Sequence, residues 1–153
     1  MSNEKIISML NGLLEISRDG AEGFRTCAND ANDPSLKLYF EDRALSCDEA
    51  IQSLSEEILG YGGNPETSGT TAAVVHRTWI DIKTALTNVD NLTVLEECER
   101  GEDAAVIAYE KALQEEMPDS LREVVNQQYE GAKRNHERVR ELRDEARENP
   151  DLV

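Results

Sequence analysis

Apolar residues recur every three or four positions over most of the chain, which is the spacing of one face of an α-helix. The pattern predicts four long helices, at residues 3–31, 34–59, 90–117 and 119–148, and a shorter one at 69–87. Asp33-Pro34 suits the start of a helix, while Gly60, Gly62 and Gly63 suit a helix end and the loop that follows. We therefore predict an all-α protein that forms one domain over residues 1–153.

The link between the second and third long helices shapes the predicted topology. A tight turn would make these helices antiparallel neighbours, whereas a link that spans residues 60–89 allows a crossover along the whole bundle. We therefore expect a ferritin-like four-helix bundle whose long crossover carries the short extra helix. A five-helix orthogonal bundle is the alternative arrangement.

Composition narrows the classes of partner. The 153 residues carry a formal net charge of −16, so nonspecific attraction to nucleic acid or to anionic lipid is not expected. No apolar run is long enough to span a membrane, and the first residues lack a signal-peptide pattern, so we expect a cytoplasmic protein. Cys27, Cys47 and Cys98 all fall on apolar helix faces, where a cysteine serves as a small buried hydrophobe.

One acidic residue interrupts an apolar stripe on the third long helix. Leu95, Cys98, Val106 and Tyr109 share a helix face with Glu102, which therefore points inward. An ionised carboxylate that is buried without a partner costs several kcal/mol. Glu102 thus requires a metal ion, a buried cation or neutral hydrogen-bond donors.

A buried cation is available on the second long helix. Arg43 also points inward, and a guanidinium can bind a carboxylate through two hydrogen bonds. Ser17, Gln128 and Asn135 add neutral polar groups on the apolar faces of the remaining helices. We predict a buried polar network centred on Arg43 and Glu102, and the alternative is a group that contributes packing specificity alone.

Four segments, taken in their order and spacing, resemble a known family. They are GGNP, HRTWIDIK from His76 to Lys83, CERGED from Cys98 to Asp103, and NHERVRELRD from Asn135 to Asp144. These segments are similar to those of a bacterial family of ferritin-like four-helix bundles whose function is unassigned, and the likeness extends over residues 3–147. The resemblance implies the fold and a bacterial cytoplasmic setting, but it implies no activity.

The same bundle is shared, more distantly, with rubrerythrin and other di-iron proteins. A di-iron bundle site takes one Glu from each of two helices and a Glu-x-x-His pair from each of the other two. No Glu-x-x-His occurs in this chain. By resemblance, Glu102 occupies one ligand position, and the other ligand positions fall on Ser17, Cys47, Ala50, Ala105, Ala132 and Asn135. The resemblance therefore implies that the di-iron site has been lost.

Two further candidate sites remain open. Cys98 and Glu102 share a helix face, and His136 borders the apolar stripe of the last helix, so a single Zn or Fe ion is an alternative occupant. A boundary histidine that bonds a carboxylate or the backbone is the simpler interpretation of His136. On the short helix, Trp79 is expected to pin the crossover to the bundle, and the alternative is a ligand pocket beside His76 and Trp79.

The last helix interleaves acidic and basic side chains, including Lys133, Arg134 and Arg138, which is typical of a solvated face. The chain shows no nucleophile beside a base, no phosphate-binding glycine loop and no paired inward carboxylates. We therefore predict a non-enzymatic, stress-associated or protein-interaction bundle without a cofactor, which acts as a homodimer or with another protein. The alternative is a metal- or small-molecule-binding protein with a degenerate site or residual oxidase activity.

Overall fold

The computed structural model describes residues 2–31, 33–65 and 91–148. Four helices account for nearly all of these residues: α1 (Asn3–Asp30), α2 (Pro34–Gly60), α4 (Asn91–Leu113) and α5 (Asp119–Glu148). No strand occurs within these ranges. The predictions of an all-α protein and of four long helices are therefore confirmed. The predicted short helix at 69–87, with His76 and Trp79, lies outside the described residues.

Local side-chain chemistry sets the helix starts. The Ser2 hydroxyl accepts a hydrogen bond from the Lys5 amide at the start of α1. The Asp33 carboxylate accepts from the Ser35 amide at 2.8 Å, and Pro34 occupies the first turn of α2, where no amide donor is needed. The Asp-Pro signal thus fixes the start of α2.

Two helix ends show how the chain stops. Gly62 follows α2 with φ 89°, a left-handed backbone that favours glycine, and the Gly63 amide donates back to the Ile58 carbonyl at 2.9 Å. Helix α4 ends at Leu113 rather than at residue 117, so the predicted end was wrong. After Leu113, the amides of Gln114 and Glu115 donate to the carbonyls three residues earlier, so the α-helical hydrogen bonding stops. The Arg122 guanidinium donates to the Leu113 carbonyl and so satisfies a carbonyl at the end of the helix.

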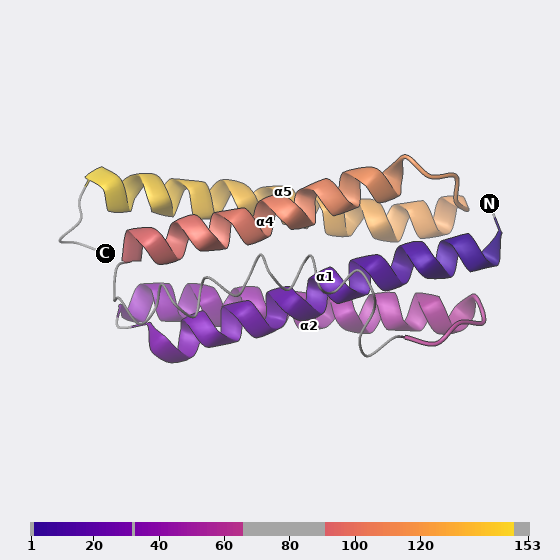
Figure 1. Ribbon diagram of the computed structural model, residues 1–153, viewed down its shortest axis with the longest axis horizontal. Coiled ribbons are helices and arrows are strands. Elements are labelled where there is room, and N and C mark those ends of the chain that lie inside the picture. Colours follow the sequence, from indigo (N-terminus) through magenta and orange to yellow (C-terminus); the bar gives the residue numbers. More distant parts are fainter. Residues whose placement is uncertain (1, 32, 66–90, 149–153) are drawn as a thin grey trace.

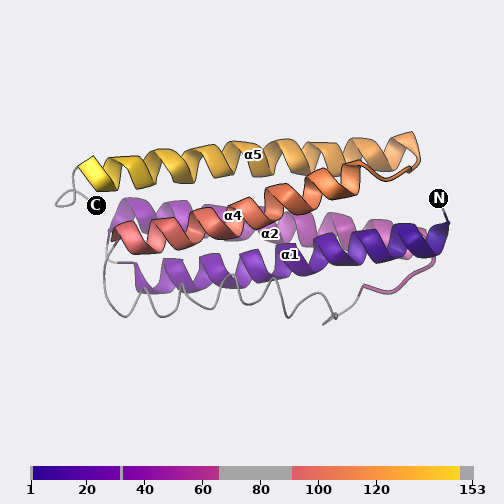
Figure 2. The same cartoon turned by 45° about the horizontal axis from the view of Figure 1, so that its top comes forward.

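The helices form two antiparallel hairpins, α1 with α2 and α4 with α5, which pack through α1 and α4 (Figure 1 and Figure 2). Helices α2 and α4 run in the same direction, so α2 ends and α4 begins at opposite ends of the bundle. This direction is the one that the predicted crossover requires. The four helices share one long axis, so the orthogonal alternative does not describe this part of the chain.

Two apolar clusters fill the interior, one toward each end of the bundle. The first contains Phe24, Cys27, Ala28, Leu36, Phe40, Ala44, Val94, Leu95, Cys98, Val139, Leu142 and Ala146. The second contains Ile6, Leu10, Leu13, Leu14, Leu54, Ile58, Tyr109, Ala112, Leu121, Val125 and Ala132. Each helix passes from one cluster to the other through a stretch of small and polar residues. The middle of the bundle therefore differs in chemistry from both ends.

The helices are amphipathic rather than apolar all round. None of them, in the part of the chain that the structure describes, is long and apolar enough to cross a membrane. The predicted inward stripes match the buried residues closely, and Arg43 and Glu102 are buried with them. Glu15 and Asp19 of α1 are buried as well, but only Arg43 and Glu102 among these described residues form a pair of opposite charges, and their surroundings define the candidate site.

Candidate functional site

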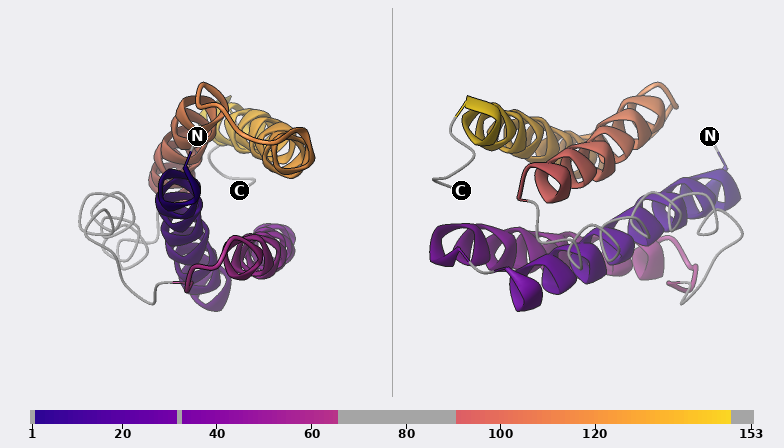
Figure 3. Two further views of the ribbon diagram at one scale, coloured as in Figure 1. Left: turned by 90° about the vertical axis from the view of Figure 1, so that its right-hand side faces the viewer. Right: turned by 60° about the vertical axis from the view of Figure 1, so that its left-hand side comes forward.

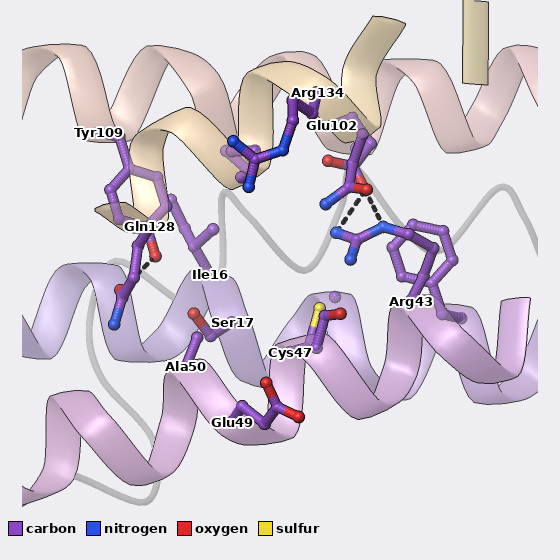
Figure 4. Close-up of a pocket in the computed structure, with 18 of the residues that line it drawn as sticks. Ile16, Ser17, Arg43, Cys47, Glu49, Ala50, Glu102, Tyr109, Gln128 and Arg134 are labelled. Atoms are coloured by element: carbon purple, nitrogen blue, oxygen red, sulfur yellow. Dashed lines mark hydrogen bonds and ion pairs between the residues drawn. The ribbon is translucent and has the colours of Figure 1, made fainter. Parts of the chain in front are cut away.

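A cavity of ≈ 430 Å³ lies in the middle of the bundle, between the two apolar clusters (Figure 4). All four helices contribute to its wall. The lining residues are Ile16, Ser17, Gly20 and Phe24 from α1; Arg43, Ser46, Cys47, Glu49, Ala50 and Ser53 from α2; Gly101, Glu102, Ala105 and Tyr109 from α4; and Gln128, Gly131, Ala132, Arg134 and Asn135 from α5.

Small side chains keep this space open. Gly20, Ala50, Gly101, Ala105 and Gly131 face the cavity from all four helices and carry at most one methyl group each. Packed cores normally leave few voids larger than a water molecule. The cavity therefore exists because each of the four helices places a small residue at the middle of the bundle.

The mouth of the cavity lies between α2 and α5. Exposed residues from these two helices, Ser46 and Glu49 on α2 and Arg134 on α5, belong to the lining. Helices α2 and α5 face each other across one side of the bundle, whereas α1 and α4 form its back (Figure 3). A ligand could therefore enter between α2 and α5 without the bundle coming apart.

Arg43 and Glu102 form an ion pair at one end of the cavity. Arg43 Nε and Nη2 both donate to Glu102 Oε1, at 3.3 and 3.0 Å, and both side chains are buried. The guanidinium also lies over the Phe24 ring, with its central carbon 5.2 Å from the ring centroid. Arg43 Nη1 forms no hydrogen bond with any described residue, and it points away from Glu102 into the cavity (Figure 4).

Burial shifts the pKa values of both members of the Arg43–Glu102 pair. It raises the pKa of Glu102 above the ordinary value for glutamate, while the Arg43 guanidinium acts to lower it. Burial alone would lower the pKa of Arg43, but the Glu102 carboxylate, together with Cys47 and Tyr39, more than compensates, so the net pKa of Arg43 is raised. Arg43 therefore stays charged. The raised pKa of Glu102 means that the protein interior disfavours the ionised form of Glu102 but not that of Arg43.

A neutral polar group occupies the other end of the cavity. The Tyr109 hydroxyl donates to Gln128 Oε1 at 2.8 Å. Burial raises the pKa of Tyr109 to about 12, with the Ser17 hydroxyl opposing this shift, so the phenol stays protonated at neutral pH. Glu102 and Tyr109 are seven residues apart on α4, which places the two ends about 10 Å apart along the axis.

The sulfur groups near the cavity are protonated thiols. Burial raises the pKa of Cys47 to about 11, and Arg43 opposes this shift. Cys98 does not line the cavity, and its Sγ lies 3.8 Å from Cys27 Sγ in the core between α1 and α4. The contact with Cys27, together with burial, raises the pKa of Cys98 well above its usual range. Neither thiol is therefore activated as a nucleophile.

The residues that the sequence predicts for the buried polar network lie together in the structure, whereas those predicted for a metal site do not. The five network candidates, Ser17, Arg43, Glu102, Gln128 and Asn135, all line the cavity. Of the metal candidates, Glu102 bonds Arg43, and His136 Nε2 lies against the Asp103 carboxylate. In the described ranges, no group of three or more His, Cys, Asp or Glu residues is arranged to hold a metal ion. His76 and Trp79 lie outside those ranges.

Sequence reasoning missed two parts of the site. Arg134 was assigned to a solvated face, yet its guanidinium reaches from α5 over the space between Tyr109 and the Arg43–Glu102 pair (Figure 4). Tyr109 was interpreted as an ordinary core position. The available signal was the position of Arg134 directly before the inward-facing Asn135, because helical side chains lean toward the N-terminus and can cover the preceding turn.

The positions that resemblance assigns to di-iron ligands converge on this one cavity. All of them are lining residues: Ser17, Cys47, Ala50, Glu102, Ala105, Ala132 and Asn135. They come from four helices and are far apart in the sequence.

The chain matches a known protein family. The family described as "Domain of unknown function (DUF2383)" matches residues 5–115 of the 153. This range covers α1, α2 and α4, which contribute three of the four walls of the cavity. A search of the curated proteins finds no match.

Proposed function

This chain belongs to the DUF2383 family of domains of unknown function, and from that premise we propose that it is a non-enzymatic ferritin-like bundle that binds a small molecule in its central cavity. The observation that carries the proposal is the cavity itself. Its volume of ≈ 430 Å³ falls within the range of roughly 300–1,000 Å³ that is typical of small-molecule sites.

The chemistry of the wall supports binding. Small-molecule sites combine mainly apolar walls with a few fixed polar groups. Here, glycine, alanine, Ile16 and Phe24 supply apolar surface, while Arg43 and Tyr109 present polar groups at opposite ends. Phe24 and Glu102 hold Arg43 in one orientation, so little side-chain freedom is lost when a ligand binds.

The proposal also accounts for the missing ligand residues. In a ferritin-like bundle, metals and their carboxylate ligands occupy the centre. Replacement of those residues by Ser17, Cys47, Ala50 and Ala105 removes side-chain volume from that centre and leaves room for an organic ligand. Between a metal ion and a small molecule as the occupant, the cavity favours the small molecule. We propose a bacterial cytoplasmic setting on the resemblance alone.

Filling the cavity tests the proposed function. Ala50→Leu should place a larger side chain in the cavity and abolish the binding of small molecules, while the thermal midpoint stays within a few degrees of wild type. Ligand-observed NMR with a fragment library of neutral, anionic and cationic compounds measures binding. The matched control is Ala104→Leu, because Ala104 is also partly exposed but does not line the cavity.

The result expected is a set of fragments that bind the wild type and the Ala104→Leu variant but not the Ala50→Leu variant. If no fragment binds the wild type, or if Ala50→Leu binds the same fragments equally well, the proposed function is wrong. Circular dichroism of each variant establishes that it is folded before binding is compared.

A second candidate function is contact with another protein, and the exposed face of α2 favours it. Leu38, Leu45 and Leu59 are exposed and lie at multiples of seven residues, so they share one face. Asp42 and Glu56 are exposed on the same face. A partner helix with an apolar stripe and basic residues would complement both the leucines and the charge of this face.

A further inference from the structure

We propose that the cavity selects an elongated organic acid, with its carboxylate between Arg134 and Arg43 and a neutral hydroxyl at the Tyr109–Gln128 end. This inference rests on the proposed function and names the ligand class for the same site. It is carried by two guanidinium groups that reach the same hollow with unused donors.

Arg134 supplies the first group. It is exposed at the mouth, and its Nη2 lies against Gly131, so the side chain folds back over the cavity. The other arginines of the described ranges bind carboxylates or backbone carbonyls; they are Arg18, Arg25, Arg43, Arg100, Arg122, Arg138, Arg140, Arg143 and Arg147. Arg134 forms no ion pair with any residue in those ranges. In a chain with a net charge of −16, this cation stands out as available for a ligand.

Arg43 supplies the second group. Its side chain is only 9% exposed, and Nη1 has no hydrogen-bond partner among the described residues. A carboxylate oxygen in the cavity would satisfy Nη1, and the second oxygen could accept from Arg134. Charge-assisted hydrogen bonds of this kind are the strong ones.

Charge balance supports an anion in the interior. Glu102 neutralises Arg43, so Arg134 is left as the cation of the cavity without a counterion among the described residues. Glu49 also lines the mouth, but it is exposed, and its repulsion acts through water, where interactions between charges are weak. A carboxylate inside the cavity therefore gains the charge of Arg134 and a hydrogen bond from Arg43 Nη1, while Glu102 already balances the charge of Arg43.

The two ends of the site set the length of the ligand. The ion pair and Tyr109 lie about 10 Å apart along the bundle axis. Tyr109 and Gln128 can exchange hydrogen bonds with a hydroxyl, and Ala105, which lies between Glu102 and Tyr109 on α4, lines the cavity. A carboxylate and a hydroxyl on opposite ends of a flat apolar body match this arrangement, and 4-hydroxycinnamate has that form.

Calorimetric titration of the full chain with 4-hydroxycinnamate tests the inference. The acid should bind roughly tenfold or more tightly than its neutral amide, 4-hydroxycinnamamide, and also more tightly than cinnamate, which lacks the hydroxyl. Arg134→Gln should weaken binding of the acid by roughly tenfold or more and leave binding of the amide unchanged. Glu49→Gln should strengthen binding of the acid, because it removes the opposing charge.

Arg138→Gln is the matched control, since Arg138 is an exposed arginine on the same helix that pairs with Glu141 and does not line the cavity. Equal binding of acid and amide, or an acid that Arg134→Gln does not weaken, would overturn the ligand class. The proposed function would still stand if neutral or cationic fragments bound the wild type and not Ala50→Leu. Absence of any fragment binding would instead remove the proposed function itself.

Discussion

At the scale of single residues, the Arg43–Glu102 pair is the feature that most constrains the core. Glu102 has a raised pKa because it is buried. The folded state therefore holds its proton more tightly than the unfolded state, so stability falls as pH rises from about 4.3, the ordinary glutamate value, through the raised pKa. Arg43 limits this loss by lowering the cost of the ionised carboxylate.

Replacement of Arg43 by methionine should lower the free energy of unfolding by roughly 3 kcal/mol at pH 7, because it strands a buried carboxylate. The loss should be smaller at pH 5, where Glu102 can take up a proton. Urea denaturation at both pH values measures this change. Arg138→Met, which breaks an exposed pair, should change stability by only a few tenths of a kcal/mol. An equally small effect of Arg43→Met would mean that water hydrates Glu102.

At the scale of elements, α2 carries two faces with separate roles. Its inner face supplies Phe40 to one apolar cluster, Leu54 to the other, and Cys47 to the cavity between them. Its start at Pro34 is predictable because the Asp33 carboxylate caps it locally. The outer face has no such local determinant, and it exposes Leu38, Leu45 and Leu59.

The leucines of α2 should contribute to binding a basic amphipathic helix. Replacing Leu38 and Leu45 together by glutamine should weaken the binding of a synthetic Leu/Lys amphipathic peptide by about tenfold, because apolar surface is lost while the charge is unchanged. Fluorescence anisotropy measures the affinity. The control is Ile107→Gln, an exposed apolar residue on α4. If both variants bind the peptide as tightly as the wild type, the face of α2 has no specific role.

At the scale of the whole molecule, the two hairpins hold together through α1 and α4. Leu95 is fully buried in the apolar cluster that also contains Phe24 and Cys27 of α1, and Cys98 contacts Cys27 directly. Helices α2 and α5 instead face each other across the cavity mouth. Contacts between the two hairpins are thus concentrated at the back of the bundle, and the cavity opens on the other side.

Truncation of Leu95 tests this distribution. Leu95→Ala should lower the free energy of unfolding by about 2–5 kcal/mol, because it leaves a cavity in the cluster that joins the hairpins. Ile107→Ala on the same helix should cost less than about 0.5 kcal/mol, because Ile107 is 52% exposed. Both values come from urea denaturation. Similar losses for the two variants would contradict the assignment of the hairpin contact to Leu95.

The sequence by itself determined the helices, their inward faces and the burial of Glu102, because helical periodicity and capping depend on residues close together in the chain. The sequence also predicts Arg43 as the cation that pairs with Glu102, because both residues interrupt the apolar faces of their helices. Only the tertiary structure decided that Arg43 and Glu102 meet, that small residues on four helices leave a common hollow, and that Arg134 covers it. These features depend on side chains that are distant in sequence and that meet in the middle of the bundle only when the four helices pack together.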